Sequence, residues 1–219
     1  MMAQEVKKVK LDPSKVNGRV GYRSIKRGFD VLASGLALIL LSPLFLILIV
    51  LIKREDGGPA FYSQERIGKS EKPFKMWKFR SMVVNADQMI DQLEDQNEIN
   101  GAMFKIKDDP RITKIGHIIR KYSLDELPQL WNVLIGDMSL VGPRPPLPSE
   151  VEEYTDYDKQ RLLVMPGCTG LWQVTERNEA DFDEMVWLDI VYINHSGLWE
   201  DLKLIIKTVL VMIHPNGAY

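Results

Sequence analysis

Two adjacent carboxylates, Asp125 and Glu126, are the residues of this sequence best suited to chemistry by type and spacing. They lie in the segment SLDELPQL (123–130). Ser123 and Glu126 have the spacing of a capping box, which is an ordinary structural way to begin a helix. In the functional interpretation, carboxylates at a helix N-terminus hold a divalent cation through their oxygens or attack phosphorus as a nucleophile. Spacing alone leaves both interpretations open.

Basic side chains that suit an anion occur on both sides of this pair in the sequence. Lys78 and Arg80 alternate along a strand predicted over 73–82, so they project from the same face of it. That face either binds an anion or is simply solvated. Arg144 stands between two prolines, which fix φ on both sides and hold its guanidinium on a stiff backbone suited to phosphate. The alternative is a rigid loop that carries a surface arginine.

An uncharged run, Val31–Ile52, precedes these residues and predicts a membrane anchor. About 22 helical residues cover roughly 33 Å, which matches a hydrocarbon core of about 30 Å. Ser42–Pro43 interrupts the run at its middle, where proline breaks or kinks a helix. Basic residues on both flanks favour the same side of the membrane for both ends. A re-entrant hairpin satisfies both observations, and a kinked spanning helix remains the alternative.

The remaining sequence predicts an α+β protein that is mostly helical. We expect a flexible basic tail at 1–21, the re-entrant anchor at 22–54 and one cytoplasmic domain at 55–219 of short strands and amphipathic interfacial helices. Strands are predicted at 60–64 and 73–82, with a strand-like run after the turn at 165. Apolar periodicity predicts helices at 83–100, 112–121, 127–136, 154–164, 181–194 and 198–213. The last of these either lies in the lipid headgroup plane or only covers the core.

Composition excludes several classes of function. The chain has 28 Lys and Arg against 30 Asp and Glu, so its net charge of −2 gives no general attraction for nucleic acid. Its single cysteine, Cys168, excludes an intramolecular disulfide and a cysteine-cluster metal site. His117 lies among apolar neighbours and is expected to pack in the core. The sequence contains no P-loop pattern, dinucleotide-binding glycine pattern or zinc-protease motif.

The order of these motifs resembles the bacterial sugar transferase family. This family comprises the monotopic phosphoglycosyl transferases, also called polyprenyl-phosphate hexose-1-phosphate transferases, and the chain is similar to its short form. The resemblance covers roughly residues 22–212. It rests on the apolar segment with a central Ser-Pro, on KFRSM (78–82), SLDELPQL (123–130), GDMS (136–139) and VGPRP (141–145), and on the Pro-Gly-x-Thr-Gly segment at 166–170.

The resemblance implies an activity and a site. Family members transfer a sugar-1-phosphate from a UDP-sugar to a polyprenyl phosphate and release UMP, which begins a surface glycan. By this resemblance Asp125 is the nucleophile that forms a covalent phosphosugar intermediate. Asp125 and Glu126 hold Mg²⁺. The expected substrate-binding residues, to which we add Arg111, are basic: Lys78, Arg80, Arg111, Arg120 and Arg144.

The same resemblance implies partners and a location. We expect a UDP-sugar donor, a polyprenyl phosphate acceptor, lipids of the bacterial inner membrane at its cytoplasmic face and downstream glycosyltransferases, whereas a homodimer is left open. The alternatives are a catalytically idle, membrane-anchored protein that binds a nucleotide-sugar or a lipid phosphate, and a bitopic protein. Met165, Cys168 and Glu176 depart from the family pattern, so neither the sugar nor the glycan follows from the sequence.

Overall fold

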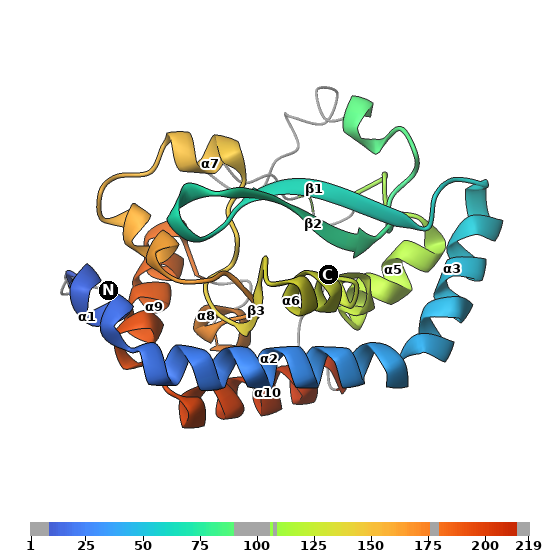
Figure 1. Ribbon diagram of the computed structural model, residues 1–219. Coiled ribbons are helices and arrows are strands. Elements are labelled where there is room, and N and C mark those ends of the chain that lie inside the picture. The colour runs from blue at the N-terminus through green and yellow to red at the C-terminus, as the bar shows by residue number, and fades with distance from the viewer. Residues whose placement is uncertain (1–8, 90–105, 107–108, 176–179, 214–219) are drawn as a thin grey trace.

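The computed structural model describes residues 9–89, 106, 109–175 and 180–213. In these residues, helices of different lengths accompany two small two-stranded sheets, so the protein is α+β and mostly helical as predicted. Figure 1 shows α2 (Val20–Leu40) along one side of the molecule and α3 (Ser42–Asp56) rising from its end. The sheets and shorter helices lie within the angle between these two helices.

The segment before α2 differs from the expected flexible tail in its described part. Helix α1 (Pro13–Gly18) begins after Asp12, whose carboxylate accepts a hydrogen bond from a backbone N–H of the first turn. Leu11 and Val16 are buried in the largest apolar cluster of the protein. Two apolar residues therefore fasten residues 11–16 to the core, and residues 1–8 lie outside the described residues.

The bend between α2 and α3 occurs where the sequence predicts a break. The two helix axes differ by 60°. Ser42 Oγ donates a hydrogen bond to the Ile39 carbonyl at 2.7 Å. Pro43 lies in the first turn of α3, where its missing N–H is not needed. Both helices are longer than half of the apolar run, with 21 and 15 residues, or roughly 31 and 22 Å.

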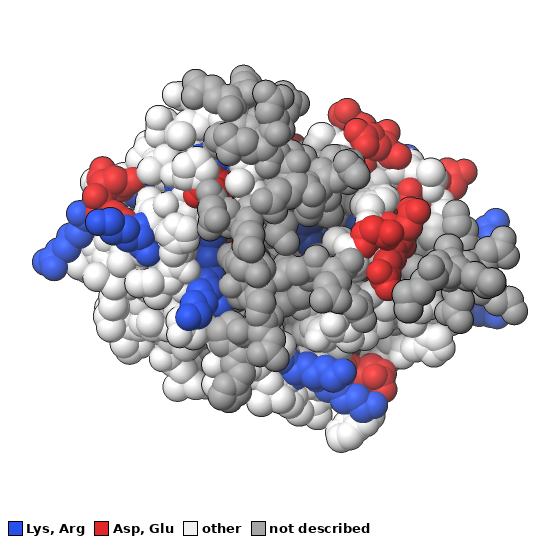
Figure 2. Space-filling view, turned by 180° about the vertical axis from the view of Figure 1, so that it is seen from behind, with Lys and Arg blue, Asp and Glu red and all other residues white. Residues whose placement is uncertain are grey.

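The bent helix pair is the part of the described chain whose length and composition bear on the predicted membrane anchor. No single helix among the described residues is long and apolar enough to cross a bilayer, whereas α2 and α3 together satisfy that length and composition. Several of their apolar side chains are largely exposed, including Leu32, Ile39 and Leu46. Viewed from behind, the molecule shows a broad uncharged area at the lower left, with acidic and basic groups gathered around it (Figure 2).

Two antiparallel strands, β1 (Phe61–Ile67) and β2 (Pro73–Phe79), follow α3. Both were predicted, and β1 extends three residues past its expected end. Their register places Tyr62 opposite Lys78. Phe79 is 1% exposed and belongs to the apolar cluster of Leu48 and Ile52 on α3. The strand pair is therefore packed directly against the bent helices.

The middle of the chain forms short helical segments. The predicted acidic helix at 83–100 is described only in its first part, as the 3₁₀ helix η2 (Ala86–Met89), and residues 90–100 lie outside the described residues. Helices α5 (Lys114–Lys121) and α6 (Gln129–Ile135) confirm the two predicted apolar helices. The 3₁₀ helix η4 (Leu124–Glu126) joins them and carries both carboxylates.

The C-terminal third contains the second sheet and the two long closing helices. Strands β3 (Ser139–Val141) and β4 (Gly167–Thr169) pair in parallel. Helices α9 (Phe182–His195) and α10 (Leu198–Ile213) confirm the last two predicted helices. For two segments, the predicted type of secondary structure was wrong. The 154–164 helix is a 3₁₀ helix, η5 (Asp158–Leu163), and the strand-like run is strand only at β4, followed by α8 (Leu171–Thr175). Helix α7 (Pro148–Glu152) was not predicted.

Candidate active site

Asp125 is buried because the chain turns sharply between α5 and α6. Ser123 adopts a left-handed conformation with φ of +53°, which directs the next three residues into η4. Asp125 is 8% exposed there. The capping-box interpretation was wrong, because the Ser123 side chain does not cap this turn and Pro128 stands at the N-cap of α6. Glu126 instead reaches across to β2.

Lys78 and Glu126 form an ion pair with 2.7 Å between Nζ and Oε1. Asn132 on α6 holds the two elements in place. Its side-chain oxygen accepts a hydrogen bond from the Trp77 N–H at 3.0 Å, and its side-chain nitrogen donates to the Lys75 carbonyl at 2.7 Å. This fully buried amide therefore takes the place of a neighbouring strand at the edge of β2 and fixes the distance between β2 and η4.

Arg120 approaches the carboxylates from the last turn of α5. Its Nε donates a hydrogen bond to Ser81 Oγ at 2.9 Å, just beyond the end of β2. Gly116 allows this close approach of α5, because a Cβ atom there would lie 2.0 Å from the Ser81 carbonyl oxygen. The Thr113 N–H donates to that same oxygen at 3.1 Å. Helix α5 and β2 therefore present Arg120 and Lys78 toward one place.

The pKa of Asp125 shows how these charges act on it. Burial raises the pKa of Asp125 to about 6, and the neighbouring charge of Glu126 acts in the same direction. The cations Lys78 and Arg120 oppose the increase. At neutral pH the carboxylate is therefore mostly ionised, yet it is poorly hydrated and more basic than an ordinary aspartate. Such a group is suited to act as a nucleophile.

Two of the predicted substrate-binding arginines, Arg80 and Arg111, form ion pairs with aspartates, and their expected role in binding an anion stays a prediction. Arg80 makes a two-pronged contact with Asp56 at the end of α3, and its Nε donates to the Pro59 carbonyl at 2.6 Å. Arg111 binds Asp109 in a buried pair with 2.6 Å between Nη2 and Oδ2. Burial alone would raise the pKa of Asp109, but Arg111 holds it below its ordinary value.

Arg144 follows β3, and a second arginine that the sequence analysis missed lies close to it. Arg144 Nη1 is 3.8 Å from Glu150 Oε1, and a third of the Arg144 side chain is exposed. Arg66 of β1 is buried and donates to the Pro145 carbonyl at 3.2 Å. Burial and the charge of Arg144 lower the pKa of Arg66 to about 10. The available signal was the alternation of β1, which places Arg66 on the face shared by Tyr62 and Lys78.

The family-model comparison now identifies the chain. Residues 21–215 match the model described as bacterial sugar transferase. The chain belongs to the bacterial sugar transferase family.

Individual relatives agree with this family. The chain is 49% identical over 194 residues to the galactosyl transferase CpsE of Streptococcus agalactiae, covering 88% of this chain and 43% of that protein. It is 47% identical over 201 residues to the undecaprenyl-phosphate galactose phosphotransferase of Salmonella typhimurium, covering 90% of this chain and 42% of that protein. It spans less than half of these two relatives. The exopolysaccharide production protein ExoY of Rhizobium meliloti is 42% identical, with 89% of this chain and 88% of that protein covered.

The carboxylate pair of this sugar transferase could supply part of the coordination of a Mg²⁺ ion. The described residues contain no group of three or more His, Cys, Asp or Glu side chains placed to hold a metal. Mg²⁺ is commonly bound by one or two carboxylates together with substrate phosphate oxygens and water. Asp125 and Glu126 supply such oxygens, and a cation beside the buried Asp125 would stabilise its charged form. The donor set therefore fits Mg²⁺ that is shared with a phosphate.

The structure also shows the surroundings of two other residues that the sequence analysis singled out. His117 is exposed on α5, so the expectation that it packs in the core was wrong. Burial raises the pKa of the Cys168 thiol far above its usual range, so Cys168 remains a neutral thiol. Glu176, which departs from the family pattern, lies outside the described residues.

Proposed function

We propose that this sugar transferase moves a sugar-1-phosphate from a UDP-sugar to undecaprenyl phosphate, releases UMP and thereby begins a cell-surface polysaccharide. The observation that carries this proposal is a buried carboxylate, Asp125, beside a second carboxylate and between two cations. Relatives add support through their names. One of them, from Klebsiella pneumoniae, is a UDP-glucose:undecaprenyl-phosphate glucose-1-phosphate transferase.

In the first step a carboxylate oxygen of Asp125 attacks the phosphorus that bears the sugar. An oxygen–phosphorus bond to Asp125 forms, and the bond from that phosphorus to the UMP oxygen breaks, so UMP leaves with the electron pair. Lys78 and Arg120 stabilise the negative charge that develops on the phosphate oxygens. The burial of Asp125 supports this role, because little hydration has to be removed from the carboxylate before it attacks.

In the second step an oxygen of undecaprenyl phosphate attacks the same phosphorus. A new phosphorus–oxygen bond joins the sugar phosphate to the lipid phosphate, and the bond to Asp125 breaks and regenerates its carboxylate. When bound, Mg²⁺ would neutralise phosphate charge in both steps. Glu126 would help to hold that ion, and its pairing with Lys78 orients its carboxylate.

The proposed acceptor is a lipid. The bent helix pair supports the proposal that the enzyme is embedded in one leaflet of the membrane. In this proposal α2 and α3 enter and leave the inner membrane from the cytoplasmic side. Basic residues flank both ends of the apolar run, and exposed apolar residues cover both helices. The site then lies at the headgroup level, where a lipid phosphate is accessible.

The test is UMP release by the purified full chain with Mg²⁺, undecaprenyl phosphate and a panel of UDP-sugars. We expect release with one or few donors, and Asp125→Asn should lower the rate by a factor of at least about 10³ because it removes the nucleophile but keeps the shape. Asp156→Asn, at an exposed position, is the matched control and should keep full activity.

A mass measurement separates the mechanism from the overall reaction. With the donor and no acceptor, intact wild-type protein should gain the mass of one sugar phosphate, and Asp125→Asn should not. UMP release that persists in Asp125→Asn would remove Asp125 as the nucleophile. Absence of release with every donor would contradict the proposed activity.

A further inference from the structure

A pocket of about 460 Å³ opens beside the carboxylate pair, between α2 and α10. Glu126 and Arg144 are the charged residues of its lining. Ala33 and Ala37 of α2 and Val209 of α10 line its apolar part. The volume lies in the range of pockets that hold small molecules or part of a larger one. The pocket therefore joins the candidate active site to two helices that expose apolar surface.

The lining selects an amphiphilic ligand. Apart from the two charged residues and Cys168, the polar side chains of the lining are Ser123, Thr169, Gln173 and Thr208, and the hydroxyls of Thr169 and Thr208 satisfy each other at 2.7 Å. Apolar side chains make up most of the remaining wall, including Leu130, Trp172 and Met212. An anionic head suits the guanidinium of Arg144, and a hydrocarbon body suits the rest. A nucleoside, which is polar along its whole length, is poorly matched to such walls.

We propose that this pocket seats the acceptor, with the lipid phosphate at Arg144 and the first isoprene units between α2 and α10. This inference rests on the proposed function and adds the place where the acceptor binds. The pocket is too small for a complete undecaprenyl chain, so the rest of the chain extends into the bilayer.

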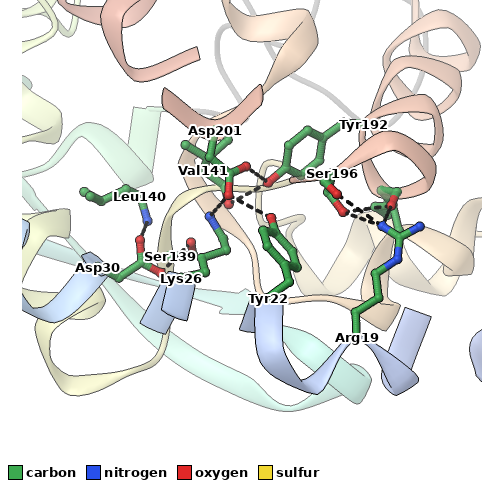
Figure 3. A network of polar contacts seen from close by, with 11 residues as sticks. Arg19, Tyr22, Lys26, Asp30, Ser139, Leu140, Val141, Tyr192, Ser196 and Asp201 are labelled. Atoms are coloured by element: carbon green, nitrogen blue, oxygen red, sulfur yellow. Dashed lines mark hydrogen bonds and ion pairs between the residues drawn. The ribbon is translucent and has the colours of Figure 1, made fainter. Parts of the chain in front are cut away.

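The position of the pocket supports entry from the membrane. Helix α10 runs alongside α2, and Asp201 of α10 binds Tyr22 and Lys26 of α2 (Figures 1 and 3). Both helices carry apolar residues that are more than half exposed, such as Leu36 on α2 and Leu210 on α10. A lipid that lies against these residues can reach the pocket without passing its hydrocarbon through water.

Adjacent residues on α10 provide a matched pair of variants. Val209 lines the pocket and Leu210 does not, and the two are 49% and 54% exposed. Val209→Trp places a large ring where we expect isoprene units to bind. Leu210→Trp adds an indole of the same size to the outer surface of the same turn.

The experiment measures the two half-reactions separately in the purified full chain. Exchange of labelled UMP into the UDP-sugar, without acceptor, reports the donor step alone. Initial rates at varied undecaprenyl phosphate report the acceptor step. We expect Val209→Trp to raise the KM for undecaprenyl phosphate by about tenfold or more, since it excludes several apolar groups from a fitted pocket, and to leave exchange unchanged. Leu210→Trp should change neither.

A second pair of variants changes residues of α2, on the opposite wall of the pocket. This pair keeps the inference testable if Val209→Trp fails to fold. Ala37→Leu fills the pocket from α2, and Leu36→Trp enlarges an exposed neighbour. We expect Ala37→Leu to raise the KM for undecaprenyl phosphate and to leave UMP exchange unchanged, and we expect Leu36→Trp to change neither. An unchanged acceptor KM in the folded pocket variants would overturn the inference, as would a raised donor KM, which would assign the pocket to the nucleotide-sugar. If wild-type protein forms no lipid-linked product, the proposed function itself fails.

Discussion

At the scale of single residues, the environment of each cation decides its role more than its type does. Lys78 and Arg80 are two positions apart, and both were expected to bind phosphate. Arg80 is committed to Asp56, with its side chain 7% exposed. Lys78 is partly exposed and acts on Asp125 and Glu126. The structure thus separates a cation that holds the fold together from one that acts at the carboxylates.

Lys78→Met should lower kcat by about 100-fold, because it removes a cation from the developing phosphate charge. Its ion pair with Glu126 is partly exposed, so the change should cost less than about 1 kcal/mol of stability. Steady-state kinetics and thermal unfolding of the same preparation measure the two effects. Lys75→Met, at an exposed position on the same strand, is the control and should retain activity. Equal loss of activity in the two variants would show that Lys78 has no special role.

At the scale of elements, a buried polar network attaches α2 to the structure that carries the site (Figure 3). Asp30 of α2 is 3% exposed, and its carboxylate accepts hydrogen bonds from Ser139 Oγ at 2.8 Å and from the Leu140 N–H at 3.1 Å. Both donors belong to β3, which leads directly to Arg144. An acidic residue of α2 therefore fixes the position of a loop of the candidate active site.

Asp201 makes the corresponding connection from α10. Its carboxylate accepts hydrogen bonds from Tyr22 Oη at 2.7 Å, Tyr192 Oη at 2.7 Å and Lys26 Nζ at 3.0 Å. Asp201 and Lys26 are 7% and 14% exposed. Burial and the Asp201 carboxylate raise the pKa values of both tyrosines, so their hydroxyls remain donors. Three donors from two helices thus converge on one buried carboxylate.

Asp201→Ala should destabilise the protein by about 3–5 kcal/mol, because it leaves the Lys26 ammonium buried without its partner. Thermal or denaturant unfolding of the full chain in detergent measures this loss. Glu200→Ala is the matched control at the preceding position. Its carboxylate pairs with Lys203 at 2.7 Å, and both side chains are 48% exposed, so its loss should be below about 1 kcal/mol. Similar unfolding of the two variants would show that the network does not hold α2 to α10.

At the scale of the whole molecule, the proposed insertion into a membrane rests on the 60° bend between α2 and α3. The sheets and the shorter helices lie within the angle of these two helices, and α10 runs along the other side of α2 (Figure 1). On α10, Trp199 and Ile213 are also well exposed. Apolar surface on three helices, together with basic flanks, supports insertion from one side.

Cysteine labelling tests this orientation. In a Cys168→Ala background, Lys15→Cys and Glu71→Cys introduce thiols at exposed positions before and after the helix pair. A membrane-impermeant maleimide should label neither position in intact cells and both after permeabilisation, because the proposed hairpin places both of its ends on the cytoplasmic side. Labelling of one position from outside would show that the chain crosses the bilayer.

Much of the fold follows from local patterns, because a periodicity of 2 or 3.6 depends only on neighbouring residues. The Ser42–Pro43 break, the strand pair after α3, and helices α5, α6, α9 and α10 all follow from such patterns. The approach of Lys78 and Arg120 to Asp125 also agrees with the residues singled out in the sequence. The types of η5 and α8 did not follow, because short segments take their conformation from the packing around them.

The amino-acid sequence by itself determined the family, the carboxylate pair and the position of the helix break, since each is written in consecutive residues. Only the tertiary structure decided which groups the arginines contact, because the partners of Arg80 and Arg66 lie far away in the sequence. It also decided that Asn132 spans the gap between α6 and β2, and that α2 and α10 enclose a pocket at Glu126. Contacts of this kind depend on how separate elements pack, and no local pattern encodes them.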